Sequence, residues 1–148
     1  MSEPTTIAAA LDAYAGFYER VTRETLPAIA ARLAPDVRFK DPFNDVRGPD
    51  AMIRVLAAMY DHGTPRFEVL DRAVGERAGY LLWRFVSAPP GGAPPWVIDG
   101  MSEIRFDDSG LVVEHIDHWD AGAQFYERLP LIGWLLRRVK RRLAVPAP

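Results

Sequence analysis

The residues best suited to chemistry lie in the segment LVVEHIDHWD at 111–120. Side chains alternate between the two faces of a strand, so His115, Asp117 and Trp119 share one face there. An imidazole and a carboxylate within reach of each other are common partners in proton transfer, and either can orient the other. The alternative is that both are hydrogen-bonded polar residues of the core without a chemical role. These three residues are therefore a candidate site, with either a catalytic or a structural role.

Metal and cysteine chemistry are disfavoured by the composition. The chain has no Cys, which excludes disulfides, thiolate ligands and a cysteine nucleophile. A His-x-Asp pair on a strand is also found in iron sites of two histidines and one carboxylate, but such a site needs a second His. The remaining histidines are His62, at a predicted helix end, and His118, on the opposite face of the strand from His115. We therefore expect no metal and no cofactor.

The elements that position this row follow an order of helices and then strands. Helical spacing of apolar residues predicts a first helix capped by Thr5 or Thr6, a second from about Thr25, and a third from Gly48 to Asp61 with Gly63 as its C-cap. The strands are predicted at 37–43, 66–74, 80–87, 96–106 and 111–120, the last two joined by the turn DDSG. This order indicates an α+β fold whose helices cover one face of a curved sheet.

The length and apolar content fit one domain over residues 1–148. A chain of 148 residues with 49% hydrophobic residues can build its own core, and it contains no repeat or linker. The N-terminus lacks a basic segment followed by a long apolar run. The longest apolar stretch, LPLIGWLL, falls well short of the roughly 20 residues that a bilayer needs. We expect a soluble, cytoplasmic protein.

Several strings and the element order resemble the nuclear-transport-factor-2-like superfamily, in its ketosteroid-isomerase and SnoaL-like branch. The strings are LAPDVRFKDPF with a later RGPDAM, the hairpin IRFDDSGLVVEHIDHWD, and the helix after it. The ending YERLPLIGWLLRRVKRRL is similar to a bacterial subgroup of that superfamily. The resemblance implies an α+β conical barrel, in which a curved mixed or antiparallel sheet wraps around the N-terminal helices, with an extra C-terminal helix. It also implies a deep apolar pocket and a homodimer packed through the outer sheet face.

The resemblance also implies roles for particular residues. In the steroid isomerases the acid before a Pro in the first strand is the general base, and it matches Asp41. That carboxylate takes a proton α to a carbonyl while donors hold the enolate oxygen. An Asp before Pro is equally typical of a turn, where it hydrogen-bonds nearby backbone. The tyrosine of the family's first helix falls on Phe17, so Tyr14 or Tyr18 would replace it, although tyrosines at this spacing also suit a helix core.

The family's second donor falls on Ser102. Asp99 has the opposite strand parity and would need a bulge to face inward. Both departures disfavour authentic ketosteroid isomerisation, while His115, Asp117 and Trp119 fall on pocket-lining positions. The expected catalytic residues are Asp41, Tyr14, Tyr18, Asp117 and His115. The residues expected to bind an apolar small molecule are Phe17, Phe39, Tyr60, Leu81, Trp83, Phe85, Ser102 and Trp119.

Two functions of different classes are consistent with these residues. The first is a small-molecule-binding protein resembling ketosteroid isomerase, an isomerase or cyclase that works by proton transfer on an apolar carbonyl compound. The second is a noncatalytic ligand-binding or dimerisation module whose C-terminal helix contacts a membrane or a protein. An open pocket would favour the first function, and a pocket filled by Trp83, Phe85 and Trp119 would favour the second.

The charge of the chain is divided unevenly. Net charge is −2, yet every acid lies at or before Glu127, and the six cations after it leave 12 cations and 20 acids, or −8, for residues 1–127. The predicted basic helix at 121–145 carries an apolar stripe of Leu131, Ile132, Leu135, Leu136, Val139 and Leu143. We favour a helix that closes the cone with its cations in water. Peripheral contact with an anionic membrane is the alternative, and nucleic acid is not expected because the body is acidic.

Overall fold

The computed structural model describes residues 6–148, and the chain divides into two compact units, 1–118 and 119–148, which are described separately. The first unit contains α1 (Ile7–Arg20), the 3-10 helix η1 (Leu26–Arg32), β1 (Leu33–Lys40), β2 (Asp45–Arg47), α2 (Pro49–Ala58), the 3-10 helix η2 (Met59–Asp61), β3 (Thr64–Val74), β4 (Gly79–Ala88), β5 (Trp96–Phe106) and β6 (Val112–His118). The second contains α3 (Ala121–Gln124), the 3-10 helix η3 (Tyr126–Arg128) and α4 (Pro130–Leu143). Within residues 6–148, no helix combines the length and the apolar content that crossing a bilayer requires.

The helices of the first unit start largely where the sequence predicts. The Thr6 hydroxyl accepts the Ala9 N–H at 3.2 Å and caps α1, whereas Thr5 lies outside the described residues. The second predicted helix is a short 3-10 helix, because the chain enters β1 already at Leu33 to pair with β6. Gly63 is not a C-cap: a Cβ there would lie 2.6 Å from the Ser87 hydroxyl, so the glycine allows the close approach of β4.

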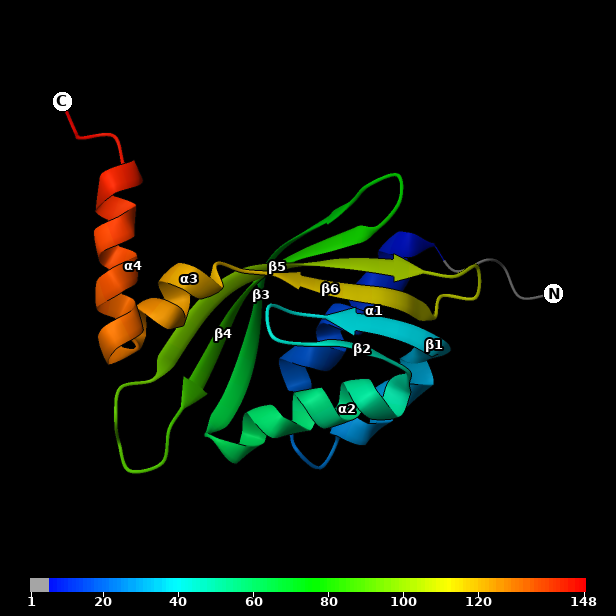
Figure 1. The fold of residues 1–148 in the computed structure, drawn as a ribbon. Coiled ribbons are helices and arrows are strands. Elements are labelled where there is room, and N and C mark those ends of the chain that lie inside the picture. The colour runs from blue at the N-terminus through cyan, green and yellow to red at the C-terminus, as the bar shows by residue number, and fades with distance from the viewer. Residues whose placement is uncertain (1–5) are drawn as a thin grey trace. The chain divides into compact units, whose positions relative to one another are not determined.

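The six strands form one mixed sheet in the order β2-β1-β6-β5-β4-β3. The pair β1 and β6 is parallel, and the other neighbours are antiparallel. The α+β class with a curved mixed sheet is therefore confirmed. The sheet curls without closing into a barrel, because its edge strands β2 and β3 do not pair with each other (Figure 1). The three-residue strand β2 was absent from the sequence prediction.

The inner face of the sheet carries the core of the first unit. Inward residues of β4 and β5 alternate as the sequence predicts, with Leu81 and Trp83 buried on β4 and Ser102 and Ile104 buried on β5. A Cβ at Gly100 would lie 2.4 Å from the Trp83 ring. Gly100 therefore gives the indole room to lie against the backbone of β5.

One departure from simple alternation lies at the start of β6. Arg105 pairs with Glu114 and Phe106 pairs with Val112, so Val113 is an extra residue without a partner on β5. Strict alternation predicts that Val112 faces away from His115. Val112 is instead fully buried, as His115 is, because this bulge shifts the phase of the strand.

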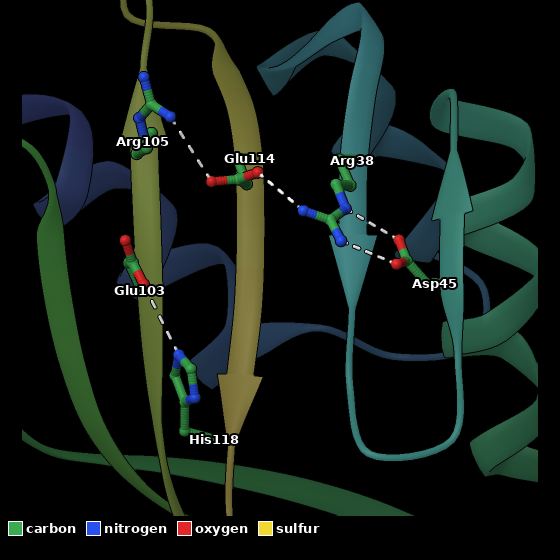
Figure 2. Close-up of polar contacts among 6 residues, drawn as sticks. All are labelled: Arg38, Asp45, Glu103, Arg105, Glu114 and His118. Carbon is green, nitrogen blue, oxygen red and sulfur yellow. Dashed lines mark hydrogen bonds and ion pairs between the residues drawn. The ribbon is translucent and has the colours of Figure 1, made fainter.

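Ion pairs cross the outer face of β1, β2, β5 and β6 (Figure 2). The Arg38 guanidinium donates to the Asp45 carboxylate at 2.8 and 2.9 Å and approaches Glu114 at 3.4 Å. Asp45 beside it raises the pKa of Arg38, and Arg38 lowers the pKa of Asp45. Nearby, His118 lies 3.6 Å from Glu103. These pairs lie at the solvent-facing side of the strands that hold the candidate site.

The second unit is not one helix over 121–145, as predicted, but the two short elements α3 and η3 followed by the fourteen-residue helix α4. Asp120 caps α3 by accepting the Ala123 N–H at 3.0 Å, and Pro130 starts α4 in its first turn. Gly133 packs against η3 so closely that a Cβ would lie 2.1 Å from the Glu127 carbonyl oxygen. Arg137 donates to that same oxygen at 2.6 Å. The backbone of η3 therefore packs on one side of α4.

Candidate functional site

The predicted contact between His115 and Asp117 is present inside the first unit. Both residues come from β6 and face inward, and the His115 Nε2 lies 2.7 Å from the Asp117 Oδ1. The His115 side chain is 4% exposed and that of Asp117 is 19% exposed. The imidazole is thus buried, and the carboxylate lies closer to the surface.

Two tyrosines of α1 extend this contact on the imidazole side. Residues four apart share a helix face, and the hydroxyls of Tyr14 and Tyr18 lie 3.3 Å apart. The Tyr14 hydroxyl lies 2.8 Å from the His115 Nδ1. Burial raises the pKa of both phenols above the ordinary value, so both stay protonated and can donate hydrogen bonds.

Two residues of the neighbouring strands extend the contact on the carboxylate side. Ser102 pairs with Asp117 across β5 and β6, and its hydroxyl donates to the Asp117 Oδ1 at 2.5 Å. The Trp83 indole N–H donates to the Ser102 hydroxyl at 2.8 Å. Asp99, the other candidate of β5, is exposed, and its carboxylate is paired with Arg84 at 2.7 Å. Ser102 is therefore the inward residue.

The six residues form one continuous hydrogen-bonded set, here called the inner network: Tyr14, Tyr18, Trp83, Ser102, His115 and Asp117. An ionised carboxylate can only accept hydrogen bonds. The proton of this hydrogen bond therefore lies on the His115 Nε2, which donates to Asp117. A neutral imidazole then accepts at Nδ1 from the Tyr14 hydroxyl. The His115 Nε2 and the Ser102 hydroxyl therefore both donate to the Oδ1 of Asp117. Both ring nitrogens of His115 are thus engaged, and the imidazole connects the Tyr14 hydroxyl to the Asp117 carboxylate.

Aromatic rings surround the buried part of the inner network. The Phe39 ring lies 5.1 Å from the His115 ring, Phe67 lies 5.4 Å from Tyr18, and Phe106 lies 6.3 Å from Tyr14. Such rings exclude water and strengthen the hydrogen bonds among the polar groups that they enclose. Phe67 and Phe106 were not among the predicted site residues, although the alternation of side chains along their strands would have placed both on the inner face.

Asp41 lies at the end of β1 in the hairpin turn to β2. Its carboxylate accepts the backbone N–H groups of Phe43 and Asn44, both at 2.7 Å, and the Asn44 side-chain amide at 3.0 and 3.1 Å. This is the turn geometry that an Asp before Pro predicts. Lys40 pairs with Ile116, so Asp41 lies at the same end of the sheet as Asp117. Its role as general base stays a prediction.

Tyr60, in η2, offers a further polar group. Its hydroxyl oxygen is buried without a hydrogen-bond partner among the described residues. Burial raises the pKa of Tyr60, and the same phenol contributes to the raised pKa of Tyr18. Buried hydroxyls normally have partners, so this one is suited to a bound molecule.

The other predicted binding residues are placed differently. Leu81 is buried on the inner face of β4, and half-buried Phe85 packs on Phe67 at 5.2 Å. Half-buried Phe17 lies against Tyr18 at 6.0 Å. Trp119 belongs to the second unit and is not part of the inner network. Within residues 6–148, no three His, Asp or Glu side chains gather as metal ligands.

Comparison with known proteins gives one family and many related folds. A family model described as a SnoaL-like domain matches residues 14–115. These residues include five members of the inner network, and Asp117 lies two residues after the end of the match. No curated protein sequence matches the chain.

Solved structures share the fold at low sequence identity. An NTF2-like protein of unknown function from Burkholderia pseudomallei is 20% identical with a TM-score of 0.66, over 83% of this chain and 95% of that chain. A hypothetical protein with a ketosteroid-isomerase-like fold from Catenulispora acidiphila, in complex with trimethylamine, is 11% identical with a TM-score of 0.67, over 80% and 91%. An LEH-like epoxide hydrolase from M. tuberculosis is 17% identical with a TM-score of 0.65, over 96% and 98%.

Proposed function

Since the chain belongs to the SnoaL-like domain family, we propose that its first unit binds an apolar carbonyl compound and moves a proton on it. The inner network is the observation that carries this proposal, because it places a carboxylate, an imidazole and two protonated phenols in continuous hydrogen-bond contact. An isomerase or a cyclase of this class needs a base and a donor for the developing enolate oxygen.

Asp117 is the proposed base. The hydrogen bonds from His115 and Ser102 both reach Oδ1, so Oδ2 is the oxygen that takes the substrate proton. His115 is a positioning residue. Its Nε2 holds the Asp117 carboxylate, and its Nδ1 is held in turn by the Tyr14 hydroxyl. The Tyr60 hydroxyl is the proposed donor to the carbonyl oxygen of the substrate, because it is buried without a partner among the described residues.

The test uses a β,γ-unsaturated ketone, whose isomerisation produces a conjugated enone that is followed by absorbance. We expect turnover by the wild type and loss of at least a hundredfold in Asp117→Asn. Asp41→Asn separates the two candidate bases, since it keeps the turn acceptor and loses turnover only if Asp41 is the base. Glu103→Gln, on the outer face, is the matched control and should keep full activity. An Asp117→Asn variant with wild-type turnover contradicts the assignment.

A second function, a noncatalytic ligand-binding or dimerisation module, is favoured by the filling of the interior with large side chains. Tyr14, Phe39 and Trp83 are all buried, and Trp83 occupies the space above Gly100. A second copy would bind the outer sheet face, where Leu82 and Met101 are exposed. Native mass spectrometry of gently purified protein tests this function: a dimer without turnover supports it, and a monomer without any retained ligand contradicts it.

A further inference from the structure

The helix α4 exposes a row of large apolar side chains. Along α4 these residues recur at the helical spacing of three and four. The row, here called the α4 stripe, consists of Leu131 (84% exposed), Ile132 (49%), Leu135 (53%), Val139 (45%) and Leu143 (78%). Such a continuous exposed apolar row marks an interaction surface.

The contacts inside the second unit leave the α4 stripe uncovered. At about 100° per residue, Gly133, Arg137 and Lys140 lie on the side of α4 roughly opposite Leu135. That side packs on η3: Arg137 donates to the Glu127 carbonyl, and the Lys140 ammonium lies 2.8 Å from the Glu127 carboxylate. The η3 element thus packs on the polar side of α4, and the stripe faces away from η3.

Positive charge borders the α4 stripe. No acid follows Glu127, whereas Arg138 and Arg141 lie along one edge of the stripe and Arg142 lies at its C-terminal end, in addition to the two cations that contact Glu127. The Arg138 guanidinium lies 5.9 Å from the Trp134 ring, which is 56% exposed. Two copies of α4 would bring these cations together, so the charge pattern disfavours self-association through the stripe.

We propose that α4 binds the surface of a membrane that contains anionic lipid. An apolar stripe bordered by Lys and Arg is the composition of a helix that lies in the membrane plane, with its apolar side at the acyl boundary and its cations among the headgroups. The fourteen residues of α4 span about 21 Å, against a hydrocarbon core of about 30 Å, so the helix lies on the bilayer and does not cross it. The residues of this docking surface and those of the inner network belong to different units of the chain.

The test is flotation of the full chain with vesicles of phosphatidylcholine alone or with 30% phosphatidylserine. We expect binding only with phosphatidylserine and at least a fivefold loss of bound protein between 50 and 300 mM salt. The double substitution Leu135→Asp and Val139→Asp should abolish binding, and Arg141→Glu with Arg142→Glu should reduce it at least tenfold. Leu70→Asp, at an exposed apolar position of β3, is the matched control and should bind like the wild type.

Three outcomes overturn the proposal. They are no flotation of the wild type at 50 mM salt, equal flotation with both vesicle types, and unchanged flotation of the Leu135→Asp and Val139→Asp variant. Light scattering on the same samples identifies a second copy as the occupant, because the wild type would then be a dimer and this variant a monomer. Circular dichroism confirms that each variant keeps its fold, which is expected because the substituted side chains are exposed.

Discussion

Strand β6 supplies one histidine to each face of the sheet, and each histidine contacts a carboxylate, Asp117 of β6 itself on the inner face and Glu103 of β5 on the outer face. On the inner face His115 lies 2.7 Å from Asp117, with side chains 4% and 19% exposed. On the outer face His118 lies 3.6 Å from Glu103, with side chains 61% and 33% exposed. Two histidines three residues apart on one strand therefore meet a carboxylate, one in the low-dielectric interior and the other in water.

The comparison shows that the partners of a pair matter more than its residue types. The inner pair is joined to Tyr14 and Ser102, so each polar atom that is lost would leave another buried group unpaired. The outer pair is solvated, and water replaces either partner at little cost.

The largest effect is expected for His115→Leu. This change removes the Nε2 donor of Asp117 and the acceptor of the Tyr14 hydroxyl, and we expect a loss of about 3 kcal/mol in the free energy of unfolding. His118→Leu should leave the urea midpoint unchanged. Equal midpoints for the two variants would show that the inner network contributes no more than a surface pair.

The next effect is a loss of stability at alkaline pH. The pKa values of Tyr14 and Tyr18 are raised in the folded chain, so the folded state keeps protons that the unfolded chain releases above its ordinary pKa near 10. The two phenols make their full contribution to the free energy of unfolding below about pH 10. This contribution is lost as the pH rises further, by about 1.4 kcal/mol for each phenol at pH 11. Urea unfolding at pH 9, 10 and 11 measures this slope. The double variant Tyr14→Phe and Tyr18→Phe should show a shallower slope, and an unchanged slope contradicts the prediction.

A smaller effect is expected for Gly100→Ala. The added methyl group meets the Trp83 ring, moves the indole away from Ser102, and should cost about 2 kcal/mol. The aromatic circular dichroism signal should change with it. Met101→Ala, at the next residue and on the outer face, should change neither quantity, because its side chain is exposed. Equal effects of the two substitutions would mean that Trp83 tolerates displacement.

The smallest effect is expected on the outer face. Glu114→Gln removes the carboxylate that approaches Arg38 at 3.4 Å and Arg105 at 3.7 Å (Figure 2). We expect only a small shift in melting temperature at low salt and a smaller one at 1 M salt, because Arg38 keeps Asp45 as a partner and salt screens ion pairs on the solvent-facing side of the sheet. A large shift that persists at high salt would show that these ion pairs contribute as much to stability as the inner network does.

Much of the fold could be predicted from the sequence because strands with one buried face carry a period of two. The strands predicted at 66–74, 80–87 and 96–106 lie within one or two residues of β3, β4 and β5. The three residues of β2 are too few to carry a pattern. The start of β1 was missed because Ala34-Pro35-Asp36 is typical of a turn, yet Leu33 pairs with Val112 of the distant β6.

The candidate site could be predicted in part. The contact of His115 with Asp117 is local, so strand parity was sufficient to predict it. The contact of Tyr14 with His115 joins residues that lie 101 positions apart, and only the packed structure reveals it. Trp83 was assigned to an apolar row because of its ring. Its indole N–H instead belongs to the inner network, and this depends on the register between β4 and β5.

The bulge at Val113 determines which chemistry the interior contains. Val112 is buried, so a strand that alternated from it without an extra residue would bring Glu114, Ile116 and His118 inward and would leave His115 and Asp117 in solvent. A single inserted residue thus determines which of the two alternating sets of side chains on the strand faces the core. Loss or gain of one residue at that position would exchange the two sets in one step, without any substitution in either of them.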